Sequence, residues 1–372
     1  MSRQRLLLAG GGHSHLFVLE ALRKRAPEWR DRLEVAMISR ELQTPYSGML
    51  PGLVAGHYRH NEAHVNLAPL AAAAGVELVE SSITALDPDA RVAVDAQGRQ
   101  WPFDIASLDI GSTPPLSQVP GAAEHALGVK PVDTFLQEWR TFQSRAGELV
   151  RPVHIVVVGG GAGGVELALA LAHRMAGRSE RVGWSLVTRG KLLSGYPRSA
   201  ARRVARHLEN AGIALHGGTE VAWVEAGMLH FADGGSAAFD ALIWATGAGA
   251  QAWVAQSGLA CVDGFVHVDS HLRSVSHPHI FAAGDIATDP LQRRPKAGVY
   301  AVRQGPVLAD NLLRTVAGQP LAAYLAQRGH LSLVSTGGRH ALAAWRGLTW
   351  EGDWVWRWKD AIDRRFMQRF TV

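Results

Sequence analysis

Apolar and polar positions in the first 40 residues follow a strand, turn, helix, strand order. Apolar runs at residues 6–9 and 33–39 predict two buried strands, and apolar positions at helical spacing over residues 16–24 predict a helix between them. Three glycines, residues 10–12, separate the first strand from the helix. This order predicts one βαβ unit.

The same order returns about 150 residues later in the chain. Residues 153–158 and 182–188 predict strands, and residues 165–175 predict a helix. A glycine turn at residues 159–164 again joins the first strand to the helix. A repeated βαβ unit predicts an α/β fold with two Rossmann-like dinucleotide-binding domains.

A small antiparallel β meander is predicted after each unit. The first covers residues 76–85 and 91–101, and the second covers residues 219–224 and 228–231. The proline-rich segment 111–121 is typical of a crossing between domains.

These patterns predict three parts of the chain. The first domain is discontinuous and comprises residues 1–117 and 271–330, and the second comprises residues 118–270. Residues 331–372 form an aromatic-rich C-terminal segment.

Composition narrows the class of protein. Of the 372 residues, 47% are hydrophobic and 19% are charged, which favours folded domains over disorder. The net charge of +5 is small, and no basic tract carries interleaved aromatic residues, so nucleic-acid binding is not expected. The single cysteine, Cys261, excludes an internal disulfide and a paired-cysteine redox centre, and fits a reducing cytoplasm. We expect no transmembrane helix, because the longest apolar stretch, 153–172, contains His154, Glu166 and the glycine turn.

The glycine spacings point to pyrophosphate binding. In Gly159-x-Gly161-x-x-Gly164, the first glycine permits a tight turn, the second admits a pyrophosphate and the third allows close helix packing. In the first turn His15 stands at the third glycine position. We expect this ring to be neutral at a helix N-terminus, and we expect His13 or His15 to hydrogen-bond toward the bound cofactor.

The residue that ends the second strand of each βαβ unit bears on the choice between NADH and NADPH. A carboxylate is usual there, because it accepts hydrogen bonds from ribose hydroxyls. The chain instead has Ser39 and Arg40 in the first unit, and Thr188 and Arg189 in the second. Arg189 would tolerate a 2′-phosphate, but it also suits an ordinary surface position, so NADH and NADPH both remain open.

A further strand, residues 280–283, ends in Gly284-Asp285. The order Gly10-x-Gly12, Gly159-x-Gly161-x-x-Gly164, Ala245-Thr246-Gly247, Gly284-Asp285 resembles the pyridine nucleotide-disulfide oxidoreductase family over about residues 5–315. One cysteine excludes the disulfide branch and disfavours sulfide:quinone oxidoreductases. Within the family, the chain resembles the cysteine-independent branch near type II NADH dehydrogenases. The stretches GGGHSHL, TPYSGMLPG, PKAGVYAVRQG and WKDAIDRRFMQRF resemble a flavoprotein group sometimes fused to selenophosphate synthase.

The resemblance implies FAD in the first domain and NAD(P)H in the second. Asp285 would bind the ribityl chain, and Lys296 and Glu166 would be the catalytic residues, beside the flavin and the nicotinamide respectively. A surface lysine and a first-turn helix acid are the alternative interpretations of these two. The implied FAD-site residues are Gly10, Gly11, Gly12, His13, His15, Ser39, Arg40, Pro51, Ile83, Gly111, Ser112, Gly284, Asp285, Lys296 and Ala297. The implied NAD(P)H-site residues are Gly159, Gly161, Ala162, Gly164, Glu166, Thr188, Arg189, Thr246 and Gly247.

The expected function is an oxidoreductase that takes hydride from NAD(P)H to flavin and passes electrons to a second acceptor. A quinone is one candidate acceptor; oxygen, another small molecule or a redox protein are the alternatives. Of the glutamines that type II NADH dehydrogenases use near quinone, only Gln304 is matched. A flavoprotein whose nucleotide state controls partner binding is the rival class.

Two further groups of residues have more than one interpretation. His57, His60 and His64 would share one helical face, but no carboxylate clearly joins them in the sequence, so we expect no metal. In the tail, apolar residues at positions 354, 358, 362, 366 and 370 form one predicted helical stripe flanked by basic residues. The segment 345–370 fits packing onto the flavin domain, a homodimer partner, or peripheral contact with the inner face of a membrane.

Overall fold

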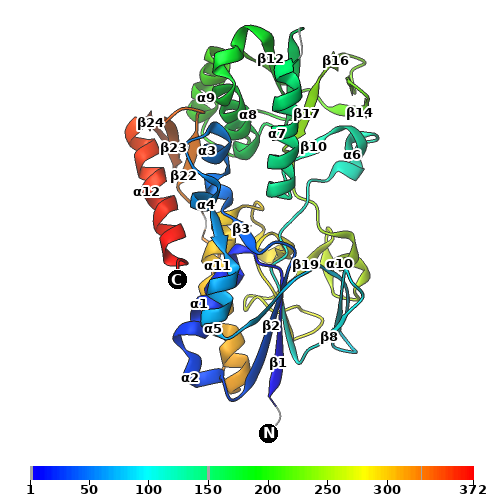
Figure 1. Cartoon of the computed structure of the whole chain (residues 1–372), viewed down its shortest axis with the longest axis vertical. Helices are drawn as coiled ribbons and strands as arrows, with labels where there is room; N and C mark the ends of the chain where they lie inside the picture. The colour runs from blue at the N-terminus through cyan, green and yellow to red at the C-terminus, as the bar shows by residue number, and fades with distance from the viewer. Residues whose placement is uncertain (1–2, 149–150, 328) are drawn as a thin grey trace.

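The computed structural model describes residues 3–148, 151–327 and 329–372. The chain forms two lobes stacked along the long axis, each built on a parallel five-stranded sheet (Figure 1). The first sheet has the order β20-β9-β1-β2-β5, with strands Ile280–Ala282, Ile105–Leu108, Gln4–Ala9, Leu33–Ser39 and Glu77–Glu80. The second has the order β10-β17-β11-β12-β13, with strands Leu127–Gly128, Ala241–Trp244, Val153–Val158, Val182–Thr188 and Ile213–Gly217.

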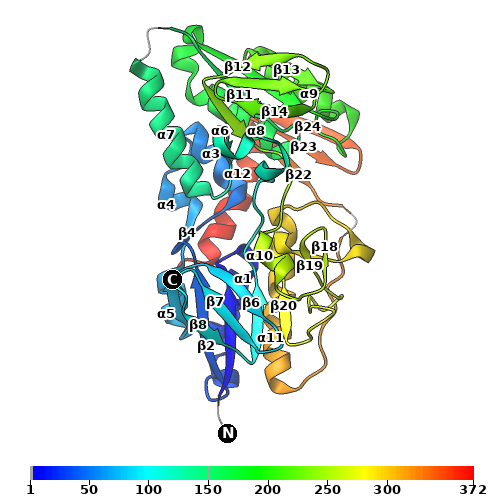
Figure 2. The same ribbon diagram turned by 90° about the vertical axis from the view of Figure 1, so that its right-hand side faces the viewer.

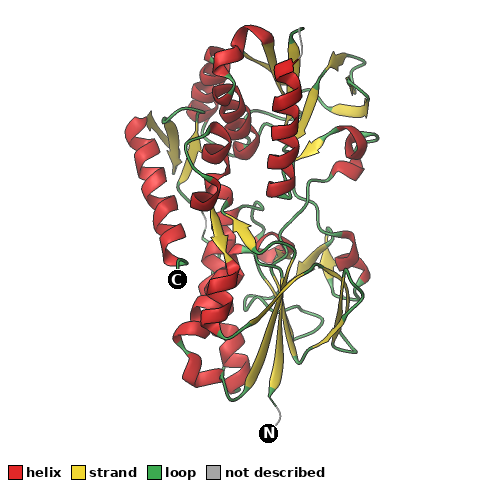
Figure 3. Cartoon of the chain, viewed as in Figure 1, coloured by secondary structure: helices red, strands yellow, loops and turns green. Residues whose placement is uncertain are grey.

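The predicted βαβ units are confirmed. Strands β2, β11 and β12 have the predicted bounds, and the first helix, α1, begins at His13 rather than at residue 16. Helices cover the parallel sheets, as buried parallel strands require (Figure 3). The longer helices are α1 (His13–Lys24), α5 (Leu67–Ala74), α7 (Val132–Glu148), α8 (Ala162–Arg174), α9 (Arg198–Asn210) and α11 (Gly298–Ala317).

The first meander differs from the prediction. The range 76–85 splits, because β5 joins the parallel sheet and only β6 (Ile83–Asp87) enters the meander. There β7 (Val92–Asp95) is the middle strand and pairs with β6 on one side and β8 (Gln100–Pro102) on the other. The second meander gains a third strand and comprises β14 (Val221–Glu225), β15 (Met228–Phe231) and β16 (Ser236–Ala238). The shorter elements are α2 (Ala26–Trp29), β3 (Gln43–Pro45), α3 (Leu50–Ala55), α4 (His60–Ala63), β4 (His64–Asn66), α6 (Ala122–His125), α10 (Ala252–Gln256), β18 (Cys261–Val262), β19 (Phe265–His267) and β21 (Ala287–Thr288).

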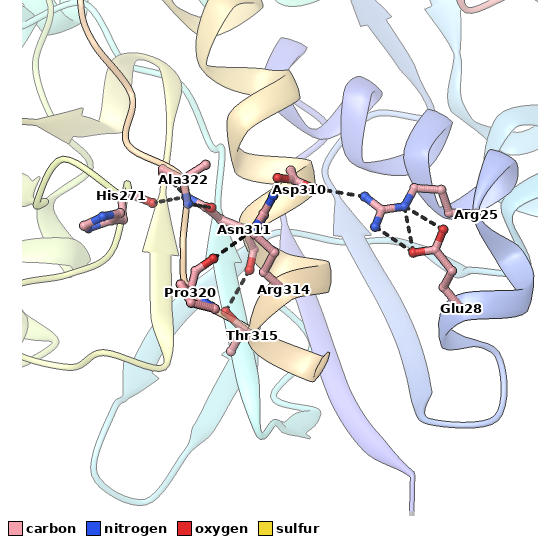
Figure 4. A network of polar contacts seen from close by, with 9 residues as sticks. All are labelled: Arg25, Glu28, His271, Asp310, Asn311, Arg314, Thr315, Pro320 and Ala322. Carbon is pink, nitrogen blue, oxygen red and sulfur yellow. Dashed lines mark hydrogen bonds and ion pairs between the residues drawn. The ribbon is translucent and has the colours of Figure 1, made fainter. Parts of the chain in front are cut away.

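Polar contacts bind the C-terminal half of helix α11 to the first lobe (Figure 4). Arg25, at the end of α1, donates to both Glu28 and Asp310. The amide of Asn311 donates to the carbonyls of His271 and Ala322, each at 2.9 Å. These bonds hold the helix whose other end carries the predicted cofactor residues.

Part of the segment predicted for the second domain packs against the first sheet. The sequence pattern predicts residues 252–270 in the second domain, yet Val254, Leu259 and Phe265 pack in one core with Leu7 and Ala9 of the first sheet. The chain passes between the lobes at two places, and the two connecting segments lie side by side. Thr113 of one segment and Gly249 of the other exchange two backbone hydrogen bonds. We therefore propose that the second lobe ends at this crossing, directly before α10.

The C-terminal segment forms a three-stranded sheet and a long helix that runs beside both lobes (Figure 2). Its elements are β22 (Ser332–Ser335), β23 (Ala341–Trp345), β24 (Leu348–Gly352) and α12 (Asp353–Arg369). Glu351 pairs with Arg203 of the second lobe, and Arg369 pairs with Glu20 of the first at 2.7 Å. Among the described residues, no helix combines the length and apolarity needed to cross a bilayer.

Candidate functional site

The first glycine turn surrounds a buried carboxylate that the sequence prediction missed. Asp109, directly after β9, accepts hydrogen bonds from the backbone N–H groups of Ser14 (2.6 Å) and His15 (3.0 Å). A Cβ at Gly10 would lie 2.5 Å from the Asp109 carbonyl oxygen, and one at Gly12 would lie 2.4 Å from its side chain. Burial raises the pKa of Asp109 to about 7. These glycines are therefore required by crowding against Asp109.

The two histidines after the turn face the protein. The buried His15 ring donates from Nδ1 to the carbonyl of Gly10 (2.6 Å) and lies 2.8 Å from the hydroxyl of Ser107 through Nε2. Burial lowers its pKa to about 4, which keeps the ring neutral as predicted. The Nε2 of His13 lies 3.1 Å from the carbonyl of Pro45. The expectation of a cofactor hydrogen bond is wrong for the His15 ring, because both its nitrogens already bind protein atoms.

A carboxylate does stand near the end of β2, although the prediction found none there. Glu41 follows the strand end by two residues; its carbonyl accepts from the Ser39 hydroxyl (2.7 Å) and its side chain pairs with Arg40 at 3.3 Å. Burial raises the pKa of Glu41. Thr44 donates to the carbonyl of Gly11 at 2.6 Å, which joins this edge to the glycine turn. Glu41 lies two residues beyond the last residue of β2, which is the sequence position that marks this acid.

Asp285 lies where the two lobes meet. Its carboxylate accepts from Ser112 (2.8 Å) and from Lys130 (2.9 Å), a residue that the prediction did not single out. Burial opposes ionisation of Asp285, but the Lys130 ammonium and the Ser112 hydroxyl outweigh it and hold the pKa below its ordinary value. Gly111 has φ +70°, and a Cβ there would meet nothing within 4 Å. Gly284 also has positive φ, and its Cβ would collide with Asp109.

A pocket of about 550 Å³, which includes its mouth open to solvent, adjoins Asp285. Lys296 lies on its wall, donates to the carbonyl of Ala287 (2.6 Å) and stands 4.0 Å above the ring of Phe265. Burial lowers the pKa of Lys296 to about 8. The Gln304 amide oxygen accepts from the backbone N–H of Gly284 at 2.7 Å. The pocket gathers Gly284, Asp285, Lys296, Ala297, Tyr300 and Gln304.

Two other residues predicted for the FAD site are buried among apolar neighbours. Ile83 opens β6 and belongs to the core between the first sheet and the meander. Pro51 lies in the first turn of α3, which packs against α8 of the second lobe. A role of either residue at a cofactor stays a prediction.

The second glycine turn has open space where a ligand would approach. A Cβ at Gly159 would lie 2.5 Å from the carbonyl of Ala245, and one at Gly164 would lie 2.0 Å from the carbonyl of Gly159. At Gly161, by contrast, a Cβ would meet nothing within 4 Å. Ala162 begins helix α8 directly after it. The crowded glycines build the turn, and the open one leaves room for a pyrophosphate at the helix N-terminus.

Other residues predicted for the NAD(P)H site lie at or after the carboxyl ends of strands β12 and β17. Thr188 ends β12, and Arg189 extends outward to pair with Glu220 at 3.3 Å. Arg189 is 79% exposed. Gly247 has φ +52° and follows Thr246 after β17, so it shares the carboxyl edge of the sheet with the glycine turn.

Glu166 joins α8 to the C-terminal segment. It accepts a hydrogen bond from the backbone N–H of Ser335 at 2.8 Å. Burial raises its pKa to about 7, and the ammonium of Lys359 opposes that rise. Lys359 is itself buried and pairs with Asp363 at 2.6 Å, so it differs from the exposed basic residues that flank the C-terminal apolar stripe.

The histidines predicted on one helical face are separated. His57 donates toward the carbonyl of Gly337 (2.8 Å), whereas His60 lies in α4 and His64 in β4. Asp133, at the start of α7, lies 3.1 Å from the Nε2 atoms of both His60 and His64. The Asp133 carboxylate therefore contacts two of the three histidines. Sequence spacing did not reveal this contact, because Asp133 is remote from His60 and His64 in the chain.

The family is settled by a match over most of the chain. Residues 5–305 match the description pyridine nucleotide-disulphide oxidoreductase. The chain belongs to this family. An NADH dehydrogenase-like protein of Mycobacterium tuberculosis is 30% identical over 224 residues, which cover 58% of this chain and 56% of that protein, so the match spans about half the relative's length. A demethylphylloquinone reductase of Synechocystis is 25% identical, over 86% of this chain and 81% of that protein.

Solved structures show the same fold. The sulfide:quinone oxidoreductase of Aquifex aeolicus aligns with a TM-score of 0.81 and 18% identity, over 99% of this chain and 91% of that one. An NDH2 of Plasmodium falciparum, solved with NADH, aligns with a TM-score of 0.80 and 15% identity, over 99% and 98%. At these identities the likeness establishes the two-lobed fold.

Proposed function

We propose that the protein is an FAD-dependent NAD(P)H oxidoreductase that passes electrons to a small quinone. One observation carries the proposal: each lobe has a parallel sheet with a glycine turn leading from its central strand into a helix N-terminus. Such turns bind the pyrophosphates of dinucleotides. The Synechocystis relative is a quinone reductase, and a potato relative, 27% identical over 44% of this chain and 35% of that one, is an NAD(P)H-ubiquinone oxidoreductase.

The residues present suit FAD in the first lobe. When bound, FAD supplies two-electron redox chemistry and can release the electrons to a second acceptor. Asp285, held ionised by Lys130, offers carboxylate oxygens to a ribityl hydroxyl. Lys296 and the N-terminus of α11 place positive charge beside Asp285 and favour an anionic ring there. Glu41 offers a carboxylate to the adenosine ribose.

NAD(P)H would lie along the second glycine turn. Gly161 leaves room for the pyrophosphate, and Thr246 and Gly247 share that edge of the sheet. Glu166, with a pKa of about 7, is able to hold or give up a proton near neutral pH. Arg189 has Glu220 as its neighbour, so a 2′-phosphate would have to compete with that carboxylate.

The test is spectroscopic and anaerobic. Purified protein should be yellow; NADH or NADPH should bleach the flavin absorbance, and a soluble quinone should restore it. Comparing the two bleaching rates decides the nucleotide preference. Protein that folds but carries no flavin and binds none when it is supplied would overturn the proposal. Slow bleaching accompanied by a change in oligomeric state would favour the regulatory flavoprotein instead.

We also infer that the outer face of α12 and β24 contacts an anionic membrane surface. Trp354, Trp358 and Ile362 are 50%, 42% and 42% exposed on α12. The adjoining hairpin of β23 and β24 also exposes Trp345, Leu348 and Trp350, and Arg357 and Arg365 are exposed on α12. Tryptophan beside arginine suits the boundary between headgroups and acyl chains. We call the residues Trp345, Leu348, Trp350, Trp354, Trp358 and Ile362 the aromatic face.

A further inference from the structure

A compact cluster of three ligand-type side chains joins the two lobes beside the β3–β4 strand pair. His60 lies in α4 and His64 in β4, and Asp133 lies in the first turn of α7, which packs with the second lobe. The two imidazole rings stack with centroids 3.7 Å apart. Each Nε2 lies 3.1 Å from the same carboxylate oxygen of Asp133. All three ligand atoms lie within 4.8 Å of one another.

The hydrogen bonds of His64 leave one nitrogen with an unmatched lone pair. Its Nδ1 lies 2.8 Å from the carbonyl of His60, which only accepts, so Nδ1 carries the proton of the neutral ring. The Nε2 lone pair then faces the Asp133 carboxylate, and the two atoms are not aligned for a hydrogen bond. The side chain of His64 is 0% exposed, so water does not relieve this conflict.

A metal cation between the three side chains would remove the conflict. We propose that His60, His64 and Asp133 bind one divalent transition-metal ion, Zn²⁺ being the best match. Ligand atoms about 2.0–2.2 Å from a tetrahedral zinc ion stand roughly 3.4 Å from one another, and the observed separations of 3.1 Å from Asp133 are close to that. The His64 Nδ1–carbonyl bond is the outer contact that commonly orients a metal-bound histidine.

The open side of the cluster supplies the remaining coordination position. The side chains of His60 and Asp133 are 41% and 33% exposed, so solvent reaches the ion and a water molecule completes the tetrahedron. Bound there, the ion ties α4 and β4 to the first turn of α7, and so joins the two lobes. Its role is a clamp between lobes, independent of whether the nucleotide proposal holds.

Zinc titration of the full chain tests the site. Protein freed of metal by a chelator and returned to buffer is titrated calorimetrically with Zn²⁺. Wild type should bind one ion, and His64→Ala and Asp133→Asn should each weaken binding by about tenfold or more. Mg²⁺, which prefers oxygen ligands, should not compete.

Two further variants keep the outcome clear. His60→Ala changes a half-exposed side chain and leaves the core intact, so it should fold, yet Zn²⁺ should raise the Tm of wild type and not of this variant. His277→Gln is the matched control, because His277 also pairs with a carboxylate, Asp89 at 3.3 Å, but belongs to no three-ligand group in the described part of the chain. Zinc binding by His60→Ala at wild-type strength, or absence of binding by wild type, would overturn the proposal.

Discussion

At the scale of single residues, glycines of one motif have different reasons to be glycine. Gly10 and Gly12 are forced by crowding against Asp109, and Gly164 by crowding against the carbonyl of Gly159. Gly161 is the exception, because a Cβ there meets no protein atom. Gly163 in the same turn is equally open, so packing within the described protein requires glycine at neither position.

This difference predicts opposite effects for two alanine substitutions. Gly161→Ala should leave the Tm near that of wild type but weaken NAD(P)H binding by about tenfold, about 1.4 kcal/mol, because the methyl group occupies the pyrophosphate space. Gly164→Ala should instead lower the Tm, because its Cβ would lie 2.0 Å from a backbone oxygen. Nucleotide titration and thermal melting measure the two effects. Unchanged nucleotide affinity in Gly161→Ala would contradict the assignment of this turn.

Asp109 predicts a pH dependence of stability. Its pKa rises from 3.8 in the unfolded chain to about 7 in the buried site. Between these values the folded state keeps a proton that the unfolded state releases, so stability is greatest below about pH 4 for this group and falls as pH rises toward 7. The slope is at most about 1.4 kcal/mol per pH unit. Asp109→Asn keeps an acceptor for Ser14 and His15, and denaturant titrations from pH 5 to 7 should show a flatter profile than wild type.

At the scale of elements, the apolar residues of α12 do not share one face, although their spacing of four predicts a single helical stripe. Apolar residues four apart advance about 40° per step around a helix of 3.6 residues per turn. From Trp354 to Phe370 the stripe therefore rotates by about 160°. Its beginning faces outward, whereas Phe366 and Phe370 pack in the first lobe with Phe17. The helix consequently serves the core at one end and the aromatic face at the other.

The two ends of the stripe should respond differently to truncation. Phe370→Ala should cost about 3 kcal/mol of unfolding free energy, because a buried aromatic ring 5.1 Å from the ring of Phe17 is lost. Trp358→Ala should change stability by less than about 0.5 kcal/mol. Chemical denaturation of both variants measures this, and equal losses would show that the stripe is buried throughout. Deleting the whole tail is uninformative, since α12 supplies core residues.

At the scale of the whole molecule, the aromatic face predicts binding to membranes. Wild type should sediment with vesicles rich in an anionic phospholipid, and the double variant Trp354→Ser/Trp358→Ser should bind about tenfold more weakly while its rate with a soluble quinone is unchanged. Trp223→Ser is the control, because Trp223 is similarly exposed at 41% but lies on β14. If the double variant instead changes the elution volume in size-exclusion chromatography, the face is a dimer contact.

The lobes are also connected in ways that only the folded molecule reveals. Strand β20 returns from beyond the second sheet to pair with β9, and Lys130 crosses between lobes to Asp285. The polar neighbours of the candidate site come from four separate stretches of the chain. The sequence did not predict Asp109 or Lys130, because their partners, Ser14 and Asp285, are remote in the chain. It did not predict Glu41, because this acid lies two residues beyond the end of β2.

Local pattern determined the βαβ repeats, the strand bounds of β2, β11 and β12, and the family, because apolar periodicity and glycine spacing are local properties of the chain. Tertiary structure alone decided the inward orientation of His15, the burial of Lys359 with Asp363, and the placement of residues 252–270. It also brought Asp133 to His60 and His64. Each depends on contacts between residues far apart in sequence, and these are set by how the sheets and helices pack rather than by any neighbouring pattern.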